Sequence, residues 1–185
     1  VINGGAVWFE QETTIKDEER FLDEWTNLIR KFGGKDDDIW FVFSENENEK
    51  IHKFRHSIST KVNEFVTRNN FRKLGTDVAV PDGVFEELYY FSKKLTEEAG
   101  INYVVYGHFG NSHMHFNFLP ETEEQFTISK ELYHKICLYA IELNGTVSAE
   151  HGLGKVKRDY LKLMYGEEVV KKMTAIKKVL DPNMI

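Results

Sequence analysis

The sequence predicts an α+β fold, because strand-like and helix-like segments alternate along its 185 residues. Short runs rich in β-branched and aromatic residues alternate with longer stretches in which apolar residues recur every three or four positions. No low-complexity linker divides the chain, and 41% hydrophobic residues are enough for one domain to bury a core. The order of the segments favours ferredoxin-like halves, in which an antiparallel sheet has helices packed on one face.

Each element follows from its local pattern. The predicted strands are 6–10, 39–43, 77–80, 103–106 and 114–119. The predicted helices are 21–32, 51–65, 85–99, 132–143 and a last helical region over 161–180. Glycines at the predicted helix ends, such as Gly100, suit the left-handed conformation that often closes a helix. Asp82 is expected to cap the helix that follows it.

Composition and charge exclude several classes of protein. The net charge of −6 argues against nucleic acid as a partner, and we find neither a signal peptide nor an apolar run long enough for a transmembrane segment. The single cysteine, Cys137, excludes an intrachain disulfide and fits a reducing, cytoplasmic location, with the thiol expected in the core rather than reactive. The chain lacks an initiator Met and stops abruptly, so we expect it to be a piece of a longer protein.

Two segments about thirty residues apart carry the residues that suit a reactive site. The first, Gly107–Asn117, holds three of the seven histidines within eight positions, and the second, Ala149–Gly154, places Glu150 beside His151. Two or three imidazoles and one carboxylate are ligands that a divalent transition metal takes while positions stay open for substrate. The sequence therefore predicts a metal-assisted site.

The spacing of the histidines supports a shared site. His113 and His115 alternate along a predicted strand and so face the same side, and His108 lies within reach if the two strands form a hairpin. His52 and His56 form a rival pair at helical i,i+4 spacing. No carboxylate lies on the next turn of their face, so the first cluster is favoured.

Longer strings around these residues resemble the C-terminal domain of the FAD-linked oxidases. That family includes the glycolate oxidase D subunit, D-lactate dehydrogenase and D-2-hydroxyglutarate dehydrogenase, and the similarity covers about residues 40–183. In chain order, the strings are Asp77-Val78-Ala79-Val80-Pro81, His108-x-Gly110, His115-x-Asn117, 146–154 with Lys157-Arg158-Asp159, and 176–183. Their joint occurrence in this order is strong evidence for the resemblance.

The resemblance implies a metal centre with a neighbouring base. His108, His115 and Glu150 match the metal ligands, with zinc expected first and manganese or iron next. His151 matches the base that takes the proton of a 2-hydroxyl group. The other roles open to His151 are a third metal ligand and a hydrogen-bonded structural imidazole.

Other matched residues would contact substrate or flavin. Arg55 matches a clamp on a substrate carboxylate, Ser59 a hydroxyl contact one turn later, and Asn117 a polar substrate contact. An exposed helix arginine paired with a nearby acid is the alternative for Arg55. Gly152 has no side chain and would let substrate or flavin approach closely. A family lysine just before the strand that begins at Asp77 has no aligned counterpart, and Lys73 lies close to that position but is shifted.

The chain departs from the family between its histidines. Where the family usually has His-x-Gly-Asp-Gly-Asn-x-His, this chain has Asn111, Ser112 and His113 in place of the Asp, Gly and Asn. We expect His113 to be an extra ligand or a substrate contact. A different substrate range or a weakened metal site are the other consequences left open.

For the chain as a whole, the resemblance implies a fragment of a flavoenzyme. Residues 1–185 would be the C-terminal substrate- and metal-binding (cap) domain, and an FAD-binding domain upstream would hold most of the FAD and be its partner. The substrate would be a small 2-hydroxy acid of the D-lactate, glycolate or D-2-hydroxyglutarate type, and the hydride would pass to the flavin. The fragment would be inactive alone. The electron acceptor and a homo-oligomeric state stay open.

Two alternatives come from other functional classes. Residues 113–118 superficially resemble a histidine-triad nucleotide hydrolase, whose pattern needs a histidine where Asn117 stands. The second alternative is a non-catalytic metal-binding or partner-docking module with the same fold, which the substitutions at 111–113 favour. Measurements of metal content and of flavin reduction by 2-hydroxy acids in the full-length protein would distinguish a dehydrogenase from both alternatives.

Overall fold

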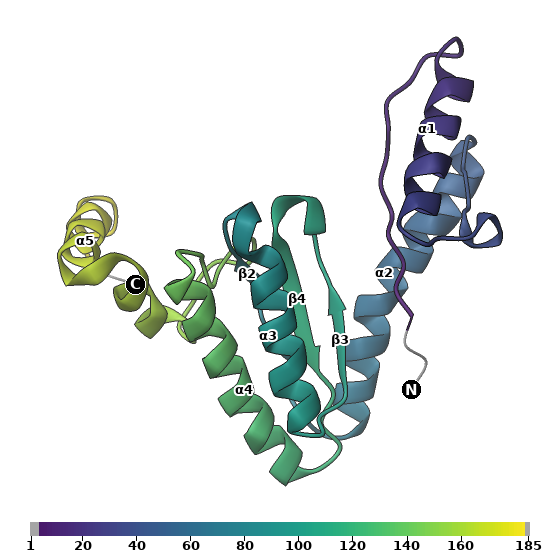
Figure 1. Ribbon diagram of the computed structural model, residues 1–185. Coiled ribbons are helices and arrows are strands. Elements are labelled where there is room, and N and C mark those ends of the chain that lie inside the picture. The colour runs from purple at the N-terminus through teal and green to yellow at the C-terminus, as the bar shows by residue number, and fades with distance from the viewer. Residues whose placement is uncertain (1–3, 184–185) are drawn as a thin grey trace. The chain divides into compact units, whose positions relative to one another are not determined.

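The computed structural model describes residues 4–183, which divide into two compact units at Lys53 and Phe54 (Figure 1). This border lies inside helix α2 (Glu45–Arg68), so no glycine- or proline-rich linker marks it in the sequence. The first unit contains helix α1 (Glu18–Lys31), the 3-10 helix η1 (Asp36–Asp38) and the beginning of α2. All candidate site residues lie in the second unit.

The strands predicted at 6–10 and 39–43 are wrong. Among residues 4–183, neither segment pairs with another strand, and a strand needs a neighbour for its backbone hydrogen bonds. Their aromatic side chains contact helices or solvent instead. The ring of Phe9 lies 4.1 Å from the ring of Trp25, and Trp40 is 65% exposed. Aromatic content alone was therefore a misleading signal for a strand.

The second unit is built around one central strand. Strand β4 (His113–Phe118) pairs antiparallel with β3 (Tyr103–Tyr106), with Tyr106 opposite His115. It also pairs with β1 (Leu74–Gly75) and β2 (Val78–Ala79), two short pieces separated by Thr76 and Asp77. The predicted α+β class with an antiparallel sheet is confirmed.

Helices α3 (Phe85–Glu98) and α4 (Glu123–Glu142) cover one face of this sheet (Figure 1). The core between them includes the following buried side chains: Leu88, Met114, Phe116, Phe118, Leu132, Ile136 and Cys137. Each large apolar side chain buried in this way contributes about 1.5–3 kcal/mol. Cys137 lies in the core as predicted, and burial raises the pKa of its thiol to about 11.

The predicted end of α3 is confirmed, whereas the predicted cap at its beginning is wrong. Gly100, with φ +66°, closes α3, and Gly166, with φ +77°, kinks the last helix α5 (Arg158–Leu180). Asp82 does not cap α3. It belongs to the 3-10 helix η2 (Asp82–Val84), and its Oδ1 accepts a 2.6 Å hydrogen bond from the hydroxyl of Ser112, which joins this turn to the start of β4.

Candidate functional site

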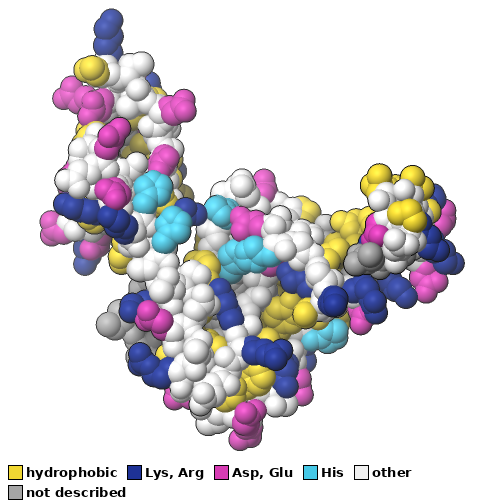
Figure 2. All heavy atoms as spheres, turned by 180° about the vertical axis from the view of Figure 1, so that it is seen from behind, with side chains coloured by type: hydrophobic (Ala, Val, Ile, Leu, Met, Phe, Trp, Pro, Cys, Tyr) yellow, Lys and Arg dark blue, Asp and Glu magenta, His cyan; other side chains and the backbone are white. Residues whose placement is uncertain are grey.

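Strand β4 separates a core face from a polar face. All six of its residues are buried, and alternate side chains point to opposite sides of the sheet. Met114, Phe116 and Phe118 face the core, which leaves His113, His115 and Asn117 on the face that α3 and α4 do not cover. Figure 2, seen from behind, shows histidine and acidic side chains side by side on that face.

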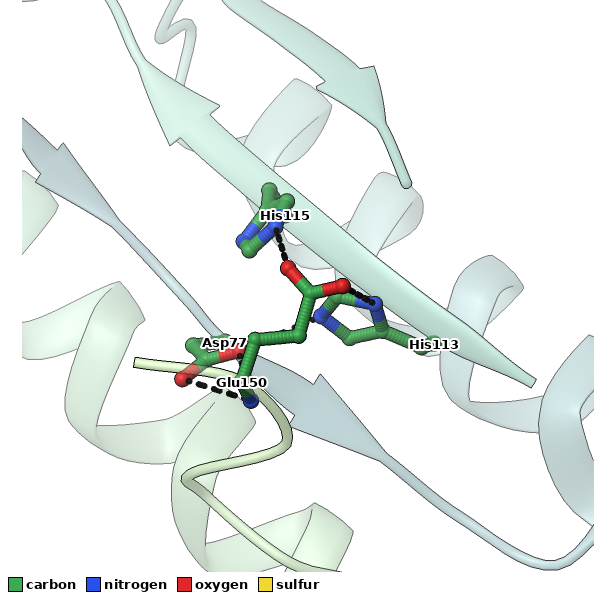
Figure 3. Close-up of side chains that lie close together, drawn as sticks. All are labelled: Asp77, His113, His115 and Glu150. Atoms are coloured by element: carbon green, nitrogen blue, oxygen red, sulfur yellow. Dashed lines mark hydrogen bonds and ion pairs between the residues drawn. The ribbon is translucent and has the colours of Figure 1, made fainter. Parts of the chain in front are cut away.

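The Glu150 carboxylate is the point at which the histidines converge. Its Oε1 lies 2.9 Å from Nε2 of His108 and 3.8 Å from Nδ1 of His113, and its Oε2 lies 3.3 Å from Nε2 of His115. One ligand atom from each of Asp77, His113, His115 and Glu150 lies within 4.8 Å of the others (Figure 3). The hairpin of β3 and β4, joined through η3 (Phe109–Asn111), brings His108 to the Glu150 carboxylate, although His108 is not one of the four residues of this group.

The break between β1 and β2 orients both buried imidazoles. Nδ1 of His115 lies 2.9 Å from the carbonyl oxygen of Thr76, and Nε2 of His113 lies 3.2 Å from Oδ1 of Asp77. Because a carbonyl or an ionised carboxylate only accepts hydrogen bonds, those two ring nitrogens carry the hydrogen. In the neutral rings, the opposite nitrogens therefore present lone pairs toward Glu150.

Asp77 is a functional residue that the motif analysis did not identify. Its side chain is 1% exposed, and it accepts hydrogen bonds from the backbone N–H groups of Glu150 at 3.2 Å and His151 at 3.0 Å. The sequence signalled it only as a carboxylate at the start of an otherwise apolar strand and as the first residue of a string that resembles the family, with no role attached. These hydrogen bonds hold the backbone of Glu150 and His151 in place.

Charge keeps Asp77 ionised despite its burial. Burial alone would raise the pKa of this carboxyl, but the N–H of His151 and the nearby ammonium of Lys157 outweigh it and lower the pKa below its ordinary value. Nζ of Lys157 lies 3.2 Å from Oδ2 of Asp77 and donates to the carbonyl of Val147 at 2.7 Å. Lys157 therefore ties the loop that carries Glu150 to the sheet. Burial of the imidazole of His113 lowers its pKa, and this is the largest of the effects on that group.

His151 lies at the open side of the cluster. Its side chain is 64% exposed, and its ring stacks on that of His115 with centroids 4.8 Å apart. Its Nδ1 is 3.8 Å from Oδ2 of Asp77, and its Nε2 is 3.9 Å from Oε2 of Glu150. Gly152 follows with φ +74° and has open space where a Cβ would be. The predicted base and the predicted ligands thus lie together, with room beside them.

The predicted substrate residues fall in two environments. Ser59 on α2 is half-buried and accepts a 3.4 Å hydrogen bond from the hydroxyl of Tyr106, which also accepts from Nζ of Lys73 at 3.1 Å. The ring of Tyr106 lies 5.6 Å from that of His115, so this chain of contacts borders the histidine cluster. Arg55 is exposed on α2, one turn before Ser59.

Asn117 is fully buried, and its amide donates to the carbonyl of His115 at 3.1 Å. Its Oδ1 has no hydrogen-bond partner. A Cβ at Gly75, the residue opposite on β1, would lie 2.4 Å from this oxygen, so the lack of a side chain there leaves room for the amide. The rival pair His52 and His56 lies outside the cluster of candidate ligands found among residues 4–183.

Comparison with known proteins identifies one family. The family model for "FAD linked oxidases, C-terminal domain" matches residues 3–185. A mitochondrial D-lactate dehydrogenase [cytochrome] from Arabidopsis thaliana is 30% identical over 169 residues, which cover 90% of this chain and 30% of the relative. A D-2-hydroxyglutarate dehydrogenase from Stutzerimonas stutzeri is 30% identical over 155 residues, covering 77% of this chain and 31% of the relative.

A third relative, a D-lactate dehydrogenase from Archaeoglobus fulgidus, is 34% identical over 149 residues, which cover 80% of this chain and 32% of the relative. The chain thus spans about a third of the length of these curated relatives. Among residues 4–183, no helix combines the length and the apolar character needed to cross a bilayer. Since one of these relatives is named mitochondrial, the cytoplasmic location stays a prediction.

Proposed function

Since the chain belongs to the family of FAD-linked oxidase C-terminal domains, we propose that it is the substrate- and metal-binding part of a flavin-dependent dehydrogenase acting on a 2-hydroxy acid. An FAD-binding domain, N-terminal in the same protein, would hold most of the FAD. The observation that carries the proposal is the convergence of His108, His115 and Glu150 next to His151. D-lactate and D-2-hydroxyglutarate are the acids that the names of the relatives suggest.

The donor set fits a divalent cation. Zinc bonds of about 2.0–2.1 Å in a tetrahedral site place two ligand atoms roughly 3.3 Å apart. The nitrogen-to-oxygen distances are close to that spacing: 2.9 Å from His108 to Oε1 of Glu150, and 3.3 Å from His115 to Oε2, the other oxygen of the same carboxylate. His115 also donates its other ring nitrogen to a backbone carbonyl, as metal-binding histidines commonly do. These three residues would hold the cation.

The residues of this chain would bind the acid and take its proton. Oxidation of a 2-hydroxy acid removes a proton from oxygen and a hydride from carbon. A bound cation would supply positive charge beside the hydroxyl, and FAD would accept the hydride. His151 is the base: when Nδ1, nearer Asp77, carries the hydrogen, Nε2 is left to accept the proton. Arg55 and Ser59 orient the carboxylate of the substrate.

The proposal is tested on the full-length protein by anaerobic flavin reduction. Glycolate, D-lactate and D-2-hydroxyglutarate are each mixed with the oxidised protein, and flavin absorbance is followed. Reduction by at least one of these acids is expected, with the L enantiomers of the chiral acids as controls. A protein that binds no flavin, or whose flavin no 2-hydroxy acid reduces, contradicts the proposal.

We expect His115→Ala to remove most of the divalent metal from the full-length protein, because it deletes a ligand and its backbone-anchored ring. Elemental analysis after purification without chelators measures this, and zinc is the metal expected in the wild type. His56→Ala is the matched control and should keep the wild-type metal content. Equal and negligible metal in the wild type and in His115→Ala contradicts the site.

We expect Arg55→Lys to lower kcat/KM by about tenfold or more with an unchanged melting temperature. Lysine keeps the charge but loses the planar two-point fork that binds a carboxylate. Steady-state kinetics and thermal unfolding provide the two measurements. Arg68→Lys, at the exposed end of the same helix, is the control for a general effect of the substitution. Unaltered kinetics in Arg55→Lys would contradict a role of Arg55 in binding the substrate carboxylate.

A further inference from the structure

We propose that His113 is a further ligand of the same cation through its Nδ1, and that Asp77 is the hydrogen-bond acceptor that sets the tautomer of this imidazole. The inference rests on the proposed function for the presence of the cation. His113 would then join His108, His115 and Glu150 as a ligand, at a position where the family usually has asparagine.

His113 turns its Nδ1 toward the Glu150 carboxylate. Its side chain is 4% exposed, and its Nε2 donates to Oδ1 of Asp77 at 3.2 Å. The ring is therefore held so that Nδ1 faces Oε1 of Glu150 at 3.8 Å, which is too long for a hydrogen bond. In the neutral ring, Nδ1 and the carboxylate oxygen therefore face each other as two acceptors.

The same arrangement occurs at His115. With Nδ1 donating to Thr76, the neutral ring of His115 turns the lone pair of Nε2 toward Oε2 of Glu150 at 3.3 Å, and this contact is a hydrogen bond only when both ring nitrogens carry hydrogen. One cation among the two nitrogens and the carboxylate satisfies all of these lone pairs together.

Asp77 lies close enough to be a ligand, but its acceptor capacity is already used. A carboxylate offers about four lone-pair sites. Four donors fill them: the N–H groups of Glu150 and His151, the ammonium of Lys157, and Nε2 of His113. We therefore assign Asp77 as a positioning residue. A carboxylate that accepts from the far nitrogen of a ligating imidazole is a common support for metal sites.

Inclusion of His113 makes the ligand set richer in nitrogen. His108, His113, His115 and Glu150 would give three imidazoles and one carboxylate, a set that suits zinc, cobalt or nickel better than manganese. With four protein ligands, binding of the substrate hydroxyl requires at least five-coordinate geometry, which zinc adopts in some catalytic sites. The site should therefore prefer zinc over manganese.

Titration with Co²⁺ tests the assignment in the metal-free full-length protein. His113→Asn should lower the affinity for Co²⁺ by about a hundredfold or more and shift the visible cobalt bands, because a ligand is lost. Asp77→Asn should lower the affinity by about 10–100-fold with a smaller shift of the bands than in His113→Asn, because all ligands are kept while the loop of Glu150 loses its anchor. His56→Asn is the matched control and should match the wild type in both measurements.

The outcomes separate this inference from the proposed function. If the wild type binds no Co²⁺, the metal centre itself fails. If the wild type binds Co²⁺ and His113→Asn keeps both affinity and bands, His113 is not a ligand. X-ray absorption of the zinc-loaded wild type and of zinc-loaded His151→Asn gives an answer without a change at His113. Three coordinated imidazoles in both proteins support the assignment, and two in the wild type overturn it even if His113→Asn does not fold.

Discussion

Replacement of His151 by asparagine is expected to slow flavin reduction by a 2-hydroxy acid about a hundredfold or more, the usual effect of losing a general base. The position of this imidazole explains the expectation. It is 64% exposed, stacks on His115, and follows the carboxylate at which the predicted ligands meet. Stopped-flow measurement of flavin absorbance in the full-length protein, with a saturating acid and no oxygen, gives the rate directly.

Two further measurements distinguish a base from the other roles of His151. Flavin and metal content should equal the wild-type values, whereas loss of a metal ligand would lower the metal content. The melting temperature should also stay unchanged, because so exposed a ring contributes little to the core. Added imidazole should restore part of the rate. His134→Asn, a histidine hydrogen-bonded to Tyr160, is the control. A wild-type rate of flavin reduction in His151→Asn contradicts the assignment.

Local periodicity predicted the arrangement of the histidines, whereas Glu150 and His151 were predicted from the resemblance to the family. Alternation along a strand placed His113 and His115 on one face, and the glycine-bracketed turn between two strands brought His108 to them. Helices such as α1 and α4 likewise followed from apolar residues at helical spacing. In each of these cases, the relevant neighbours lie within about ten residues of one another in the chain.

What the sequence did not predict depends on distant contacts. Asp77 lies 73 positions before Glu150 and 80 before Lys157, so no local pattern indicated that it anchors the loop of both. The strands expected at 6–10 and 39–43 failed for the same reason, because strand formation depends on a partner. Asp82 was expected to make the local bond to its helix, but its hydrogen bond goes to Ser112, 30 positions away.

The Asp77→Asn substitution is expected to destabilise the fold by about 3–5 kcal/mol, as when one member of a buried ion pair is removed. Lys157 would be left with its side chain only 12% exposed and without its counter-charge. The new amide would also turn an NH₂ group toward backbone N–H donors. Urea unfolding in the presence of a chelator measures the loss without any contribution from metal. The double variant Asp77→Asn, Lys157→Met should recover part of the stability, because it removes the uncompensated charge.

The destabilisation by Asp77→Asn should also depend on pH, with a sign that follows from the lowered pKa of Asp77. A carboxyl whose pKa is lower in the folded than in the unfolded state stabilises the fold fully above its unfolded value, near 3.9, and loses that contribution as the pH falls toward its folded value. The difference in unfolding free energy between wild type and Asp77→Asn should therefore be constant from pH 7 to about 5 and shrink below about 4. If the difference in unfolding free energy stays constant down to pH 3, the ionised carboxylate of Asp77 does not stabilise the loop of Glu150 and His151. That loop would then be held only by the hydrogen bond from Lys157 to the carbonyl of Val147.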